Sequence, residues 1–345
     1  MRNQRIDLFK CIAIYCVVFL HIKTGRLDWA VTALTRFAVP YFFLVAGYFA
    51  YGQSEQKLLR RARHSLVLWA EGVGLVFVLC AAMVRRNPEW SVWVYLQQQF
   101  TPRAWAELLT MQLVPFPHSY HLWFIGAMPL LYGIWWAVTR LCRRGGRRIP
   151  AGALAAAGIC LLGVHLLLGE GAALLGRDSV PAQYLRNAWM DGLPFFLLGV
   201  GMHEKEAEIT SRLSKGQILA GLLLSGGAAL AEQRLAGVQE LFAGSILFAM
   251  LLLAAGMKWG TVGQNPAARW MCFCGSSLTF YIYMLHVPMY GFFCEWSCVP
   301  LFGWIVDHPP IAAPVVALLS TGLAVGLQRV KNRIFSYSNF PENKL

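Results

Sequence analysis

Long apolar segments dominate this chain, and the short segments between them hold most of its charged residues. A helix needs about 20 mostly apolar residues to cross the ~30 Å hydrocarbon core of a bilayer. At that length the pattern predicts ten membrane-spanning helices, and therefore an all-α polytopic membrane protein. The predicted spans are residues 7–22, 31–51, 64–84, 121–140, 150–169, 186–202, 215–232, 240–257, 270–293 and 311–329.

The Lys and Arg residues between these spans indicate an orientation. If the N-terminus is cytoplasmic, the cytoplasmic segments carry 21 of the 30 Lys and Arg residues and the opposite segments carry nine. Cytoplasmic loops of membrane proteins are enriched in these residues. We therefore expect both termini in the cytoplasm.

Composition narrows the function classes. Charged residues make up 14% of the chain, against ~25% in a typical soluble domain. The net charge of +13 does not require a nucleic-acid partner, because the loop distribution explains it; we expect membrane lipid around these side chains and no nucleic acid. The nine cysteines form no CxxC pair, so we expect buried thiols and no metal centre. We expect one transmembrane domain, residues 1–335, and a short cytoplasmic tail, residues 336–345.

Candidate chemistry begins in the first predicted helix. Lys10 and His21 are eleven residues apart, which on a helix is three turns and about 20°, so both lie on one face, ~16 Å apart along the axis. Asp7 lies close to that face. An imidazole exchanges protons near neutral pH and is costly at membrane depth unless it faces a cavity or a partner. His21 is therefore a candidate proton-transfer group; an interfacial histidine at a helix end is the alternative.

Arginines form two further candidate groups. Arg36 precedes Pro40 in the second predicted span and needs an anion or carbonyl groups as partners at that depth. Arg60 and Arg63, three residues apart on a helix entering the membrane, point the same way and can bind phosphates at the cytoplasmic face. The alternatives are a structural ion pair for Arg36 and a positive-inside anchor for the other two.

The remaining candidates lie toward the outer face. His121 and Trp123 begin the fourth predicted span, Arg186 begins the sixth, and His286 lies in the ninth. His21, His121 and His286 would then lie at similar depth, which favours a site that reaches across the bilayer.

Two features stay open. Glu71 is the one carboxylate well inside a predicted span, and its partner is not readable from the sequence. The aromatic residues between Arg85 and Tyr120 indicate either an interfacial segment that contacts a saccharide or lipid headgroup, or an aromatic belt.

These motifs, in this order, resemble the membrane-bound acyltransferase 3 family over nearly the whole chain. The family's first-helix signature is an arginine, ten further residues and a histidine; here His21 matches the histidine, and Lys10 replaces the arginine. An Arg-x-x-Arg motif is matched by Arg60 and Arg63. The other segments that resemble the family are Asp7–Phe9, Arg36–Tyr48, Tyr120–Phe124 and Tyr281–Pro288. The chain resembles the stand-alone members that O-acetylate bacterial surface glycans, and is also similar to the membrane domain of VanT-type serine racemases.

The resemblance implies a multi-pass enzyme of the bacterial inner membrane that moves an acetyl group from cytoplasmic acetyl-CoA to a hydroxyl of a cell-surface glycan or lipid-linked saccharide. His21 would be the catalytic base, with a transient acetyl-His21 as a variant. Lys10, Arg60 and Arg63 would bind the donor. The candidates for binding the acceptor or stabilising the oxyanion are Arg36, His121, Trp123, Arg186 and His286.

A transporter or flippase of a lipid-linked sugar or organic acid is the second hypothesis, because polar residues inside a membrane also line transport paths. The sequence shows no internal repeat of the kind that many transporters contain. No feature of the sequence favours an interaction protein or a sensor.

Overall fold

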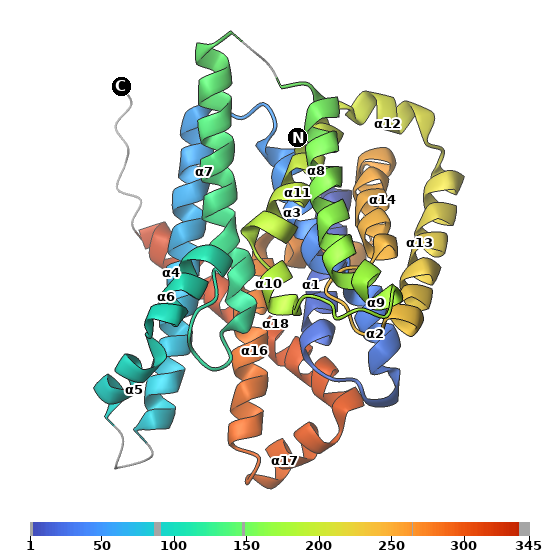
Figure 1. Cartoon of the computed structure of the whole chain (residues 1–345). Coiled ribbons are helices and arrows are strands. Elements are labelled where there is room, and N and C mark those ends of the chain that lie inside the picture. Colours follow the sequence, from blue (N-terminus) through green and yellow to red (C-terminus); the bar gives the residue numbers. More distant parts are fainter. Residues whose placement is uncertain (1–2, 86–90, 147–148, 264, 338–345) are drawn as a thin grey trace. The chain divides into compact units, whose positions relative to one another are not determined.

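A computed structural model describes residues 3–85, 91–146, 149–263 and 265–337 (Figure 1). These residues are 83% helical and contain no strand. Their contacts divide the chain into two compact units. The terminal unit consists of Met1–Arg26 and Thr261–Leu345, and the central unit consists of Leu27–Gly260.

In the terminal unit, the first helix packs against helices from the end of the chain. Asn3 caps α1 by accepting hydrogen bonds from the backbone N–H groups of Arg5 and Ile6. α1 contacts α15, α16, α18 and the short π-helical segment η5. The bounds are α1 (Gln4–His21), α15 (Pro266–Phe273), η5 (Cys274–Leu278), α16 (Thr279–Glu295), α17 (Pro300–Asp307) and α18 (Pro309–Tyr337).

A glycine allows α1 and η5 to approach closely. A Cβ atom added to Gly275 would lie 1.7 Å from the carbonyl oxygen of Asp7, so no other residue fits without a shift of the backbone. Membrane helices commonly use small residues for such contacts. The contact fixes the segment of α1 that carries Asp7 and Lys10.

The central unit is built from helix pairs, chiefly α3 with α11, α4 with α7, α8 with α11, and α13 with α14. Gly47 and Gly199 make the α3–α11 crossing close, because a Cβ on either would lie 2.0 Å from a carbonyl oxygen of the other helix. The bounds are α2 (Asp28–Thr35), α3 (Ala38–Ala50), α4 (Glu55–Val84), α5 (Val92–Gln99), α6 (Pro102–Met111), α7 (Trp123–Arg144), α8 (Ala151–Leu166), α9 (Ala172–Leu174), α10 (Ala182–Leu185), α11 (Leu193–Glu204), α12 (Glu206–Arg212), α13 (Lys215–Ala236) and α14 (Ala243–Trp259). Short 3₁₀ or π-helical segments are η1 (Gly25–Leu27), η2 (Tyr120–Leu122), η3 (Leu167–Gly171) and η4 (Ala188–Gly192).

Helix covers each of the ten predicted spans, but fewer helices are long and apolar enough to cross a bilayer. Five such segments lie among the described residues, or seven if each of two sharply bent helix pairs is one span. The first predicted span is not among them, because Arg5, Asp7 and Lys10 all lie within the 18 residues of α1. The five are Gly25–Ala50, Glu55–Val84, Tyr120–Arg144, Ala151–Leu174 and Pro309–Arg333; the bent pairs are Glu206–Arg212 with Lys215–Ala236, and Pro266–Glu295 with Pro300–Asp307.

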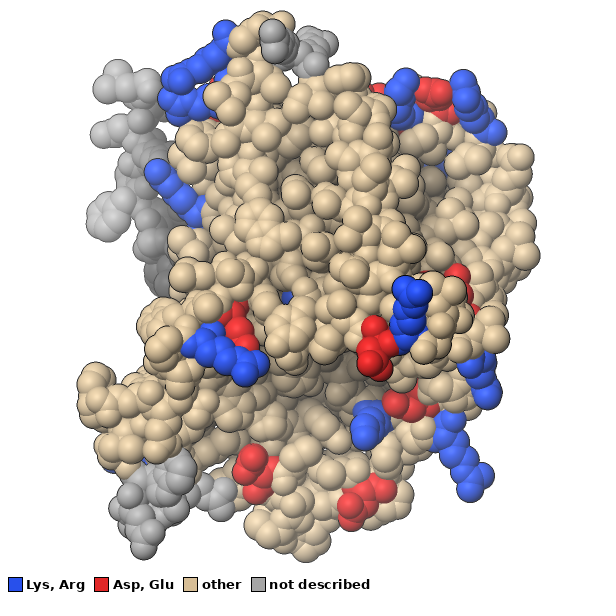
Figure 2. Space-filling view, viewed as in Figure 1, with Lys and Arg blue, Asp and Glu red and all other residues tan. Residues whose placement is uncertain are grey.

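The all-α, multi-pass class is thus confirmed, whereas the count of ten spans, the cytoplasmic termini and the single domain over residues 1–335 stay predictions. Of the predicted tail, residues 338–345 lie outside the described residues. Large apolar side chains such as Leu223, Leu224 and Leu318 are exposed, as expected of helices that face lipid. Figure 2 shows wide areas of the visible face without charged side chains.

Candidate active site

The end of α1 brings two of the predicted imidazoles together within the terminal unit. His21 is the last residue of α1, and its ring centroid lies 5.3 Å from that of His286 on α16, with a tilt of 34° between the rings. His286 is fully buried, and His21 is partly buried. Two residues 265 positions apart in the chain therefore form one histidine pair.

The surroundings of His286 determine which of its nitrogens carries the proton. Its Nδ1 lies 2.7 Å from the carbonyl oxygen of Tyr283 and 3.2 Å from that of Ile282. A carbonyl oxygen only accepts hydrogen bonds, so Nδ1 is the donor, and in the neutral ring Nε2 holds the lone pair. The ring is thus held in one tautomer and one orientation beside His21.

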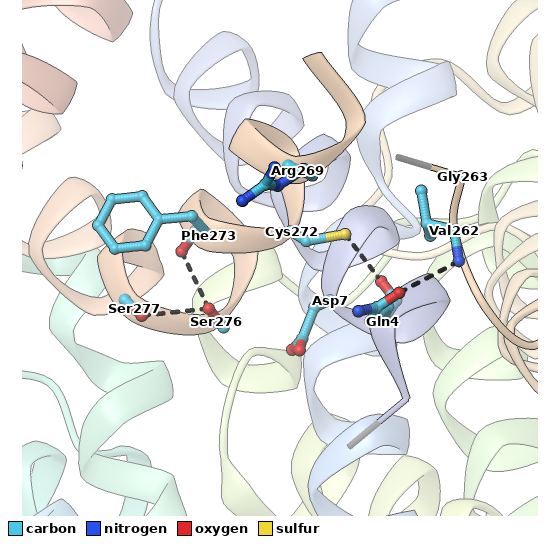
Figure 3. Close-up of a pocket in the computed structure, with 9 residues that line it drawn as sticks. All are labelled: Gln4, Asp7, Val262, Gly263, Arg269, Cys272, Phe273, Ser276 and Ser277. Atoms are coloured by element: carbon cyan, nitrogen blue, oxygen red, sulfur yellow. Dashed lines mark hydrogen bonds between the residues drawn. The ribbon is translucent and has the colours of Figure 1, made fainter. Parts of the chain in front are cut away.

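The other end of α1 carries the second half of the first-helix signature. Lys10 Nζ lies 3.2 Å from Asp7 Oδ1, one turn away on the same helix. Asp7 also lines a polar cavity of about 490 Å³ (Figure 3). The backbone N–H of Val262 donates to Gln4 Oε1, and the thiol of Cys272 donates to the Gln4 carbonyl. The cavity is lined by Gln4, Asp7, Val262, Gly263, Arg269, Cys272, Phe273, Ser276 and Ser277.

In the central unit, Arg36 and Arg186 share one carboxylate that the sequence analysis did not single out. Arg36 lies at the break between α2 and α3, with Pro40 in the first turn of α3, and its Nη1 donates to Glu240 Oε2 at 3.2 Å. Arg186 donates from Nε to Oε1 at 2.9 Å and from Nη2 to Oε2 at 2.6 Å, a two-bond geometry. The Arg36 and Glu240 side chains are each 9% exposed and the Arg186 side chain is 22% exposed. Arg36 therefore has the structural ion pair that was the alternative to a ligand-binding role.

A second polar pair adjoins this triad. Asp191 lies in the π-helical segment η4 and is buried, with Oδ1 3.5 Å from Nδ1 of His165 on α8. His165 is buried too, and the same nitrogen lies 3.2 Å from the Met190 carbonyl oxygen. Single π-helical turns are common at functional sites.

The predicted phosphate-binding arginines lie near the start of α4. Arg60 and Arg63 are both exposed, which leaves their guanidinium groups accessible. The residue between them that points inward is Arg61: its Nη1 donates to the Phe49 carbonyl at 3.0 Å, and its Cζ lies 5.8 Å from the ring centroid of Tyr132. Glu71, farther along α4, is exposed.

His121 and Trp123 are interior residues of the central unit. His121 is fully buried and Trp123 nearly so, with its ring centroid 5.7 Å from that of Phe43. In the segment between Arg85 and Tyr120, Trp93 and Trp105 are exposed on α5 and α6, and Trp90 lies outside the described residues. The common depth predicted for His21, His121 and His286 stays a prediction.

Comparison with known proteins now decides the family. A family model described as an acyltransferase domain, Acyl_transf_3, matches residues 3–329. The chain belongs to the acyltransferase 3 family. No curated protein and no solved structure matches the chain. Family membership supports a membrane acyltransferase activity in general.

Sequence reasoning missed two residues of this acyltransferase that organise its polar groups, Glu240 and Arg61. A carboxylate at the first position of a predicted apolar span was a usable signal for Glu240, because an unpaired charge there is costly. No comparable signal distinguished Arg61 from Arg60 and Arg63, since all three stand in one basic run.

Proposed function

We propose that this acyltransferase moves an acetyl group from cytoplasmic acetyl-CoA to a hydroxyl group of a cell-surface glycan or lipid-linked saccharide at the bacterial inner membrane. His21 acts as the general base. The acceptor oxygen attacks the thioester carbonyl carbon while its proton passes to the His21 ring. The C–S bond then breaks, and the coenzyme A thiolate leaves and takes the proton from the imidazolium. A transient acetyl-His21 is the variant of this route.

The observation that carries the proposal is the contact between His21 and His286 in a chain whose family is acyltransferase 3. A general base must hold one orientation to be effective. The His286 ring, fixed through its Nδ1, supports the His21 ring from one side. His286 is therefore a positioning residue in this mechanism.

The donor is bound through its phosphates. Arg60 and Arg63 are exposed on adjacent positions of one helical face, which suits the charge and spacing of phosphate groups. Lys10 is the third donor-binding residue of the proposal. Its ion pair with Asp7 limits its movement.

The acceptor side of the proposal uses the buried arginines. Glu240 holds Arg36 and Arg186 in fixed positions, from which a guanidinium group can stabilise an oxyanion or bind a saccharide oxygen. His121 and Trp123 contribute to the acceptor side from the interior of the same unit.

The test is acetyl transfer by membranes that contain the protein. With acetyl-CoA labelled in the acetyl group, we expect label in the cell-surface glycan fraction, and mass spectrometry of that glycan should show an added acetyl ester that is missing when the gene is deleted. Movement of a lipid-linked saccharide without incorporation of label would support the flippase hypothesis and contradict the enzyme.

A further inference from the structure

The central unit contains a second cavity, to which no role has been assigned above. Its volume is about 500 Å³, within the ~300–1,000 Å³ typical of small-molecule sites. It lies among the C-terminal ends of α3, α7 and α11 and the first turn of α8. The lining residues that carry the argument are Tyr51, Trp135, Thr139, Cys142, Arg143 and Glu204.

The lining groups of this cavity are complementary to a nucleotide. Tyr51 and Trp135 place aromatic side chains in the wall, where a planar base can pack. Glu204 is an acceptor for an exocyclic amino group. Arg143 offers a guanidinium group for phosphate; it contacts the Gln53 carbonyl at 3.4 Å and Glu55 at 3.8 Å through two nitrogens, and its remaining N–H groups can serve a ligand.

The position of the cavity connects it with the basic start of α4. Gln53 and Glu55, which Arg143 contacts, immediately precede or begin α4, the helix that carries Arg60 and Arg63. The Tyr132 ring, over which Arg61 lies, is one helical turn from Trp135 on α7. Arg143 at the cavity thus contacts the start of the helix that carries Arg60 and Arg63.

We propose that this cavity binds the adenine nucleotide end of the acyl donor, an inference that rests on the donor assigned under the proposed function. The base lies against the aromatic side chains, with Glu204 accepting from its amino group. Arg143 pairs with phosphate, and the rest of the donor extends from the cavity.

Cys142 provides a direct readout, because it lines the cavity and is a free, partly exposed thiol. The purified full-length protein in detergent is treated with N-ethylmaleimide, with and without adenosine 3′,5′-bisphosphate, the nucleotide fragment of coenzyme A. Mass spectrometry then gives the alkylation rate of each cysteine. We expect the nucleotide to slow alkylation of Cys142 at least fivefold and to leave Cys160 unchanged, since Cys160 is exposed on α8 and does not line the cavity.

Two matched variants identify the contacts. Tyr51→Leu removes an aromatic ring from the cavity wall, and we expect it to raise the nucleotide concentration needed for protection by up to about tenfold, the value of one aromatic contact. Arg143→Gln should have a similar or larger effect. Arg144→Gln removes the same charge one residue away from a side chain that does not line the cavity, and should have no effect.

The outcomes separate this inference from the proposed function. Unprotected Cys142 in a protein that still transfers labelled acetyl overturns the cavity assignment and leaves the enzyme intact. Protection of Cys142 by the nucleotide in a protein that transfers no acetyl group upholds the cavity and contradicts the proposed reaction. Equal protection by inorganic phosphate or by phosphatidylglycerol would mean that the cavity takes phosphate from another source, and would overturn the nucleotide assignment.

Discussion

Glu240 is the residue on which two buried arginines depend. It accepts from Arg36 and, through two bonds, from Arg186, so its charge is the nearest compensation for both guanidinium groups. Removing one partner of a buried ion pair leaves an uncompensated charge, and this typically costs about 3–5 kcal/mol. The ion pairs of Glu240 with Arg36 and Arg186 therefore support both the stability of the central unit and the position of the proposed acceptor-binding groups.

We expect Glu240→Gln to lower the thermal unfolding midpoint of the purified protein by several degrees and to reduce acetyl transfer. Glu240→Asp, which keeps the charge, should restore part of both. The matched control is Glu208→Gln, since Glu208 pairs with Lys205 and Arg212 at the surface of the same unit, where ion pairs contribute little. Equal thermal unfolding midpoints for Glu240→Gln and Glu208→Gln would contradict the stabilising role of the Glu240 ion pairs.

At this scale the sequence singled out basic residues of the candidate site but not the groups that they contact. A cation or an imidazole in an apolar segment is conspicuous, and Arg36, Arg186, His21 and His286 were all identified in that way. Their partners were not. The hydrogen bond from Arg36 to Glu240 joins residues 204 positions apart, and no local sequence pattern around either residue indicates the other. Pairing of this kind is set by tertiary packing.

Among the helices too, the local sequence pattern predicted some features and missed those that depend on packing. Hydropathy located helix at all ten predicted places, but the second predicted span, residues 31–51, is interrupted between α2 and α3, at residues 36–37. The π-helical segments were not predicted, because an extra residue in a helical turn leaves no periodic signal. One of them, η5, contacts α1 at Gly275.

Gly275→Ala tests that contact. The added Cβ would lie 1.7 Å from the Asp7 carbonyl oxygen, so α1 must shift, and overpacking of this kind typically costs about 1–3 kcal/mol or more. We expect a lower yield of monodisperse protein on size-exclusion chromatography and weaker acetyl transfer. Gly322→Ala is the control, because it lies in α18 of the same unit and its Cβ would meet nothing within 4 Å. If both variants behave like the parent protein, the α1–η5 contact does not determine the position of the site.

For the whole molecule, the prediction from the sequence is an orientation with cytoplasmic termini. The 21 to nine division of Lys and Arg residues supports it. Green fluorescent protein, which fluoresces only in the cytoplasm, should be fluorescent when fused at the C-terminus or after Gly145. Alkaline phosphatase, which is active only outside, should be active after Leu113. The reverse pattern at any of these positions would contradict the ten-span arrangement.

The proposed reaction depends on His21 acting as the base for acetyl transfer, and the most direct measurement is the rate of labelled acetyl transfer by His21→Ala in reconstituted vesicles. A positioned base contributes ~10²–10⁴-fold, so we expect a rate lower by at least a hundredfold in protein that purifies with the parent's yield and elution profile. His308→Ala, at an exposed histidine of the same unit, should transfer acetyl at the parent rate. A His21→Ala protein that acetylates the acceptor as fast as the parent would contradict the mechanism.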